Sequence, residues 1–127
     1  MYEYTHINPA NCEFYEIASI EDLPTGERLI VQIDDQEILV FNIAGEIFAI
    51  GNVCSHDGNP LDDGELDDHE ITCVRHGARF DIRTGKVRSM PAIVDIPAYP
   101  ARIVDGKIEI GLPKGGEEVN LYFLPNA

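Results

Sequence analysis

Two short stretches of the chain each pair a cysteine with a histidine. "CSH" places Cys54 two positions before His56, and "CVRH" places Cys73 three positions before His76, with 16 residues between the pairs. Thiolate and imidazole are soft or borderline ligands, so four of them in two glycine-bearing loops predict a metal centre. Buried side chains without a function, or a disulfide between the two cysteines, would leave both histidines unexplained.

Two kinds of centre use two cysteines and two histidines. Zinc accepts this set tetrahedrally, but its sites usually place cysteine with cysteine and histidine with histidine in each turn. In a mixed-ligand two-iron cluster, two cysteines hold one iron and two histidines hold the other. We favour the iron–sulfur cluster, because each loop would then supply one ligand to each iron.

The rest of the chain predicts strands to position these loops. Helical periodicity is nearly absent, and apolar-rich segments alternate with turn signals, as in an all-β sandwich or barrel. The expected strands are 14–18, 28–33, 37–43, 46–50, 70–73, 102–104 and 107–110. Tight connections are expected at 34–36, 44–46 and 104–107, with Asp-Gly in the last of these.

Three further segments have a local signal. Glycine, aspartate, asparagine and proline crowd into residues 51–68, so the centre is expected to be built from loops. Ser19 with Asp22 three positions later predicts one helical turn before Pro24. The apolar stretch 119–124 is expected to add one more strand.

Composition limits the function further. The chain of 127 residues has 23 acidic against 9 basic residues, a net charge of −14, which disfavours nucleic acid and anionic membranes as partners. The charge fits either a well-solvated surface or steering toward a basic protein partner. No apolar run is long enough to span a membrane and no signal peptide is evident, so we expect a cytoplasmic protein. Three cysteines argue against a secreted disulfide framework and leave Cys12 without an expected role.

The stretches "CSHDGNPLDDGEL" and "HGARFDIRTGKV" resemble Rieske-type ferredoxins of multicomponent ring-hydroxylating oxygenases. The resemblance covers about 14–111 and implies a single domain, 1–127, with an all-β, Rieske-like fold. That fold is an antiparallel sandwich with a loop-built cluster-binding subdomain at about 52–91. It also implies one [2Fe-2S] cluster and a third covering loop at Pro91. The ligands it implies are Cys54, His56, Cys73 and His76. Val74 departs from the family's usual proline.

The resemblance also indicates which kind of cluster to expect. The respiratory type carries a disulfide at the positions of Asn59 and Arg75, and hydroxyls at those of Ala78 and Phe80. Hydrogen bonds to sulfur stabilise the reduced state, so their absence predicts a reduction potential near the bottom of the Rieske range. Nearby acidic side chains, expected to be exposed, would lower it further; they are Asp62, Asp63, Glu65, Asp67, Asp68 and Glu70.

The resemblance implies a one-electron carrier between a flavin- and nicotinamide-dependent reductase and a terminal oxygenase. We expect no enzymatic activity of its own, because the chain has no acid–base pair, phosphate-binding loop or facial-triad set. The outward edges of His56 and His76 are the expected electron exit, whereas His6 and His69 have no expected role. Two alternatives are a Rieske subunit held in a larger enzyme, such as a nitrite reductase small subunit, and a zinc-stabilised interaction module.

Overall fold

The computed structural model describes residues 9–33, 35–56, 58–75, 77–92 and 94–113. In this part of the chain every strand pairing is antiparallel, and the only helices are the 3₁₀ turns η2 (Pro9–Asn11) and η3 (Ile20–Asp22). The strands are β1 (Cys12–Ser19), β2 (Arg28–Ile33), β3 (Gln36–Ile43), β4 (Glu46–Gly51), β5 (Glu65–Asp67), β6 (Glu70–Thr72), β7 (Arg79–Asp81), β8 (Val87–Ser89), β9 (Ala98–Tyr99), β10 (Ala101–Val104) and β11 (Lys107–Pro113). The all-β expectation is confirmed.

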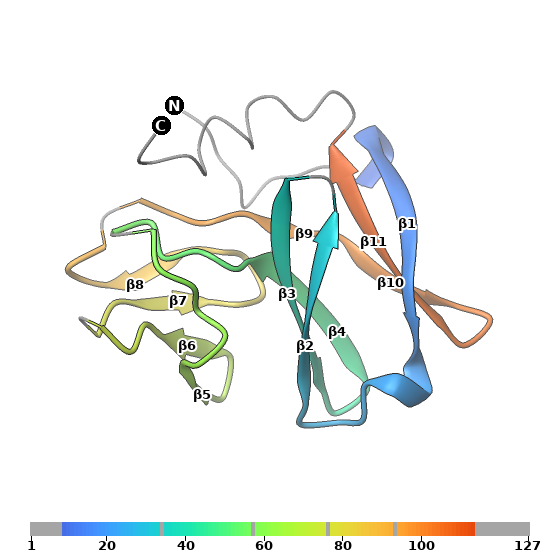
Figure 1. Ribbon diagram of the computed structural model, residues 1–127, viewed down its shortest axis with the longest axis horizontal. Helices are drawn as coiled ribbons and strands as arrows, with labels where there is room; N and C mark the ends of the chain where they lie inside the picture. Colours follow the sequence, from blue (N-terminus) through green and yellow to red (C-terminus); the bar gives the residue numbers. More distant parts are fainter. Residues whose placement is uncertain (1–8, 34, 57, 76, 93, 114–127) are drawn as a thin grey trace.

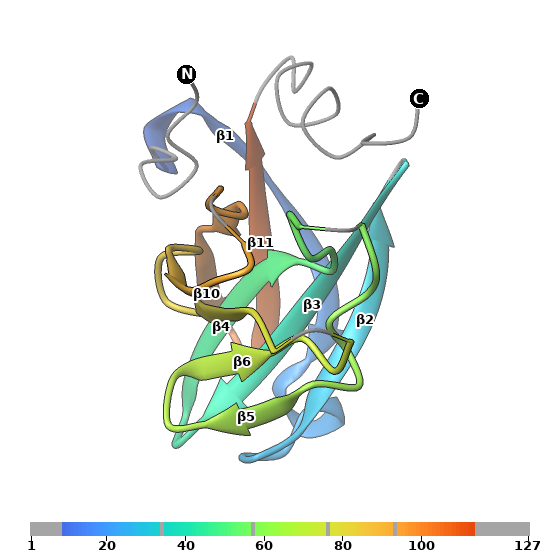
Figure 2. The same ribbon diagram turned by 90° about the vertical axis from the view of Figure 1, so that its left-hand side faces the viewer.

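The strands form three sheets. Their orders are β1-β11-β10, β2-β3-β4-β9 and β5-β6-β7-β8. Figure 1 shows the middle sheet with the β1-β11-β10 sheet on one side of it and the β5–β8 sheet on the other. The turned view in Figure 2, with β5 and β6 in front of β3 and β4, shows the same layering. We call the sheet of β5–β8 the small sheet.

Strand β3 explains why the middle sheet can be covered on both faces. Its side chains alternate, so Ile38 and Val40 enter a core shared with β11, whereas Leu39 and Phe41 enter a second core shared with the small sheet. All four are at most 1% exposed. An unbroken apolar run is the pattern of a strand buried on both faces.

Two of the expected tight connections are two-residue hairpin turns with both central residues at positive φ. Ala44 and Gly45 join β3 to β4, and Asp105 and Gly106 join β10 to β11. This turn type matches the right-handed twist of the strands. At the third connection β2 ends at 33 and β3 begins at 36.

The seven strands that were predicted within the described residues are all present, with shifts at their ends. The four that the sequence pattern did not predict, β5, β7, β8 and β9, have two or three residues each. Alternation cannot be recognised over so few positions. Strand β5 lies inside 51–68, which was expected to be loop throughout.

The smaller expectations have mixed outcomes. The predicted helical turn is η3, where the Asp22 carboxylate accepts a hydrogen bond from the Ser19 backbone N–H at 3.2 Å. The stretch 119–124 lies outside the described residues. None of the helices in the described ranges has the length and apolarity needed to cross a membrane.

Candidate metal centre

The segments that follow the two predicted cysteine ligands have the same backbone hydrogen bonds. In each, the cysteine N–H donates to the carbonyl five residues on, and the cysteine carbonyl accepts from the N–H four residues on. The distances are 2.7 Å for Cys54 N to Asn59 O, 2.7 Å for Gly58 N to Cys54 O, 2.7 Å for Cys73 N to Ala78 O and 3.0 Å for Gly77 N to Cys73 O. The two loops therefore share one local fold.

A glycine closes each of these loops. Gly58 has φ of 78° and Gly77 has φ of 81°, in the left-handed region. A residue with a Cβ rarely adopts this backbone conformation, so glycine at both positions lets each loop turn back on its cysteine. The sequence showed these glycines without showing their shared role.

The loops bury both cysteine thiols, and the first loop exposes the His56 side chain. Cys54 and Cys73 are each 1% exposed and belong to the same apolar core, together with Leu61, Phe80 and Ala92. His56, two residues beyond the first cysteine, is exposed. This separation gives a redox group a protected thiolate side and an accessible imidazole side.

The fourth expected ligand, His76, lies outside the described residues. Within the ranges that the structure covers, no three histidine, cysteine or carboxylate side chains come together as a metal site. The full four-ligand set therefore stays a prediction. The described residues of the second loop repeat the two backbone hydrogen bonds of the first.

The residues that are described fit a mixed-ligand two-iron cluster. All three cysteines lie in the described ranges, and none forms a disulfide. Two buried thiols from matching loops and one surface histidine are the donor types that such a cluster takes. Ala78 and Phe80, both 0% exposed, pack in the core beside the cysteines, so neither expected position supplies a hydroxyl.

Side chains outside the predicted ligand set hold the first loop in place. Arg28 on β2 donates through Nη1 to the carbonyls of Asp62 at 3.1 Å and Gly64 at 2.8 Å. The Ser55 hydroxyl donates to the Val94 carbonyl, which ties the first loop to the segment that follows Pro91. The Asn52 side chain accepts from the Leu61 N–H and donates to the Asp62 carboxylate, which holds the two ends of the same loop together. Sequence reasoning missed these side chains, because their partners lie 9 to 39 residues away.

The acidic segment 62–70 is less exposed than expected. Four of its six carboxylates are exposed, but those of Asp62 and Glu70 are half-buried. Asp62 accepts a hydrogen bond from Asn52, and Glu70 pairs with Arg79 at 3.5 Å and Arg88 at 3.3 Å. Neighbouring strands of the small sheet supply these arginines, which the charge run alone could not show.

Asp81 on β7 is a carboxylate whose pKa is changed by folding. Burial alone would raise its pKa, but hydrogen bonds from the Arg83 guanidinium at 3.0 and 3.1 Å, and from the Arg83 backbone, lower the pKa below the ordinary aspartate value. The same contacts raise the pKa of Arg83. This pair fixes the turn between β7 and β8.

His69 is not one of the predicted ligands of the metal centre. It lies in the turn between β5 and β6, and its side chain is only 22% exposed. Its ring packs edge-on against Phe48 at 5.6 Å between centroids. This histidine is part of the packing between the small sheet and β4.

The comparisons agree with this geometry. The Rieske [2Fe-2S] domain model matches residues 13–100. The ferredoxin component of the naphthalene 1,2-dioxygenase/salicylate 5-hydroxylase systems of Ralstonia sp. is 36% identical over 93 residues, covering 73% of this chain and 89% of that protein. The biphenyl dioxygenase ferredoxin subunit of Pseudomonas sp. (strain KKS102) is 38% identical over 91 residues, covering 71% and 84%. The chain belongs to the Rieske [2Fe-2S] family, and its cofactor is one Rieske [2Fe-2S] cluster.

Solved structures show the same fold. The Sphingomonas yanoikuyae B1 ferredoxin superposes with a TM-score of 0.72 at 32% identity, covering 80% of this chain and all of that one. A putative NADH-dependent nitrite reductase small subunit from Mycobacterium tuberculosis superposes with a TM-score of 0.70, covering 79% of this chain and 95% of that one. Its identity is 23%, so this second likeness shows the fold alone.

Proposed function

We propose that this chain is a one-electron carrier, the ferredoxin component of a multicomponent dioxygenase system. In this role it passes electrons from a flavin- and nicotinamide-dependent reductase to a terminal oxygenase. The observation that carries the proposal is the pair of matching cysteine loops in a chain whose relatives are named as ferredoxin components. Those relatives are covered over 84–89% of their length, so the likeness extends over nearly the whole of each.

The proposed ligands follow from the two loops. Cys54 and Cys73 would hold one iron from the buried side, and His56 and His76 would hold the other. The cluster supplies a site that takes up and returns one electron. The chain itself holds the thiolate side in an apolar core and keeps His56 at the surface, where a partner can approach.

The proposed reduction potential is low for a Rieske centre. The oxidised cluster with its two thiolates is formally neutral and becomes negative on reduction, so hydrogen-bond donors near sulfur would raise the potential. Ala78 and Phe80 supply no hydroxyl there. The exposed carboxylates of the small sheet disfavour the added negative charge, with screening by salt.

The domain boundaries and the location are also proposals. We place a core at about 14–111 and the cluster-binding part at about 52–91 of a single domain. Cytoplasmic location fits the expected reductase and oxygenase partners. The alternative of a permanent subunit of a nitrite reductase has only the likeness in fold in its favour, and a partner that co-purifies stoichiometrically would support it.

Alanine variants of the four proposed ligands test the assignment. Replacing Cys54, His56, Cys73 or His76 should abolish the visible and EPR signals of the Rieske cluster and the transfer of electrons to the oxygenase. Cys12→Ala is the matched control, because Cys12 is buried in β1 outside the cysteine loops and should leave the signals unchanged. A Rieske signal of normal intensity in any ligand variant would show that the assignment is wrong.

The acidic segment allows a separate test of partner docking. Asp63→Lys, just before β5, and Asp67→Lys, in β5, reverse exposed charges without breaking the Asp62 hydrogen bond. If this segment docks a basic surface, the transfer rate should fall and depend less on salt. Glu16→Lys and Glu21→Lys, in β1 and η3, are the matched controls. Equal effects of both pairs would exclude docking through this segment.

A further inference from the structure

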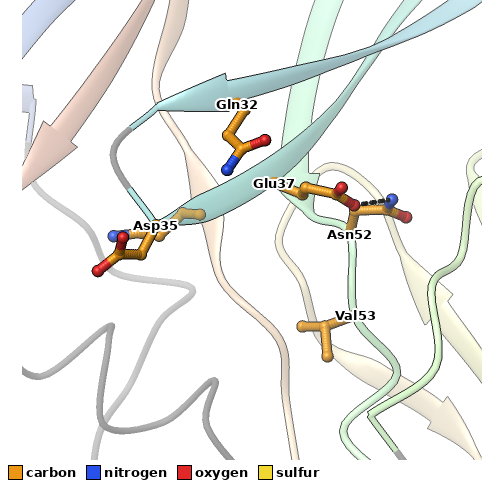
Figure 3. A pocket seen from close by; sticks show the side chains of 6 residues that line it. Gln32, Asp35, Glu37, Asn52 and Val53 are labelled. Atoms are coloured by element: carbon orange, nitrogen blue, oxygen red, sulfur yellow. Dashed lines mark hydrogen bonds between the residues drawn. The ribbon is translucent and has the colours of Figure 1, made fainter.

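Asn52 makes an unusually complete set of hydrogen bonds two residues before Cys54. It is 7% exposed, and its Oδ1 accepts from the Leu61 backbone N–H at 2.8 Å. Its Nδ2 donates to the carboxylates of Glu37 and Asp62, each at 3.1 Å. Its own N–H donates to the Glu37 carbonyl at 2.9 Å. Figure 3 shows the Glu37–Asn52 hydrogen bond between β3 and the segment that leads to the first cysteine loop.

These bonds join the two ends of one loop. The segment 52–62 leaves the middle sheet at Asn52 and returns at Leu61 and Asp62, so the Asn52 amide bridges its base. Arg28 holds the returning end from β2 through the carbonyls of Asp62 and Gly64. The cysteine and histidine of the first loop therefore project from a base that a single amide side chain closes.

The amide also separates two negative charges. Glu37 and Asp62 both accept from the same Nδ2 group, so their carboxylates lie close together on either side of it. Without that donor the two carboxylates would repel each other, and the returning end of the loop could move away from β3. Glu37 and Asn52 both line a pocket of about 310 Å³.

We propose that Asn52 is a positioning residue for the cluster, which keeps the loop of Cys54 and His56 closed and so controls how firmly the cluster is held. The inference rests on the proposed function, because it concerns the same cluster. Partners beyond the direct ligands commonly change metal affinity 10- to 100-fold when they are removed. A role in folding alone would lower stability without this selective effect.

Asn42 on β3 provides a matched control. It is 5% exposed, its Nδ2 donates to the Leu23 carbonyl at 2.8 Å and its Oδ1 accepts from the Gly45 N–H at 2.9 Å. Its partners lie in the β3–β4 turn and beside η3, away from both cysteine loops. Truncating either asparagine removes a buried amide with its hydrogen bonds, but only Asn52 bridges the cluster loop.

The test is the rate at which an iron chelator removes the cluster from the cluster-loaded protein, measured by visible absorbance well below the unfolding temperature. Asn52→Ala should lose its cluster about tenfold faster than wild type and shift the g-values of the EPR signal. Asn42→Ala should lower the unfolding temperature and keep the wild-type rate and g-values. Equal rates for the two alanine variants would overturn the inference.

A second variant keeps the test decisive if Asn52→Ala does not fold. Asn52→Asp keeps an acceptor for the Leu61 N–H, but it replaces the donor to both carboxylates with a third negative charge, so this variant should lose its cluster faster than wild type. A rate equal to wild type would overturn the inference. If the wild-type protein itself carried no Rieske cluster, the proposed function would fail instead, and the two failures are therefore distinguishable.

Discussion

Ala78 lies at the end of the second cysteine loop and is fully buried beside both cysteines. Its carbonyl accepts the Cys73 N–H at 2.7 Å, so its backbone is held next to that cysteine. At the scale of the residue, a single atom can change the reduction potential of the cluster. A hydroxyl at this position could donate to sulfur, and the methyl group that is present cannot.

Ala78→Ser should therefore raise the midpoint potential, by some tens of millivolts, because a hydrogen bond to sulfur favours the reduced state. A redox titration of both proteins under the same conditions measures the shift. Ala49→Ser, which adds the same hydroxyl in the core between the sheets, should leave the potential unchanged. An unchanged midpoint in Ala78→Ser would contradict our explanation of the low potential.

At the scale of elements, glycines determine how the loops and strands approach one another. Gly85, in the turn between β7 and β8, has φ of 78°, and a Cβ there would lie 1.9 Å from the Ile96 carbonyl oxygen. The Ile96 N–H donates to the Gly85 carbonyl at 2.8 Å, so this contact joins the turn to the segment before β9. The segment 94–97, which precedes β9, is anchored there.

Gly85→Ala should destabilise the protein much more than Gly106→Ala. Both glycines have φ near +77°, and an alanine in this region costs about 1–2 kcal/mol. Nothing lies within 4 Å of a Cβ on Gly106, whereas Gly85→Ala must also displace backbone, which adds roughly 1–3 kcal/mol. Chemical unfolding of both variants measures the difference, and equal losses would show that the contact with Ile96 is unimportant.

The strands and turns also show how much of the fold could be predicted from the sequence. The longer strands and the tight turns between them were predicted, because their signal is local and the strand signal lasts for several residues. Four of the five strands of two or three residues were not predicted, because pairing with neighbours creates them. The same limit applies to the centre. Residue type and spacing identify the four predicted ligands, which are Cys54, His56, Cys73 and His76. They do not identify the hydrogen bonds of Asn52, because its acceptor Glu37 lies 15 residues before it.

At the scale of the whole molecule, the net charge of −14 lies unevenly on the chain. The small sheet has exposed carboxylates on β5. Its arginines on β7 and β8 pair with Glu70, and Arg83 in the turn between these strands pairs with Asp81. Pairing within one sheet holds together strands that are too short to be stable alone. Acid should weaken the molecule by breaking these pairs.

Asp81→Asn should remove part of this sensitivity to acid. The pKa of Asp81 is lower in the folded than in the unfolded protein, so its stabilising effect is complete above the ordinary aspartate range and is lost as pH falls through the folded value. Wild type should be the more stable protein at pH 7, and the difference should shrink below about pH 4. Thermal unfolding of both proteins across this range tests the sign, which a constant difference would contradict.

The most direct test of the central claim is an EPR-monitored redox titration of the purified protein. Our account predicts the signal of a mixed-ligand two-iron cluster, with a midpoint near the low end of the range of roughly −150 to +300 mV that Rieske centres cover. A high midpoint would contradict the argument from Ala78 and Phe80. A colourless protein that contains zinc and gives no signal would contradict the assignment of the cluster itself.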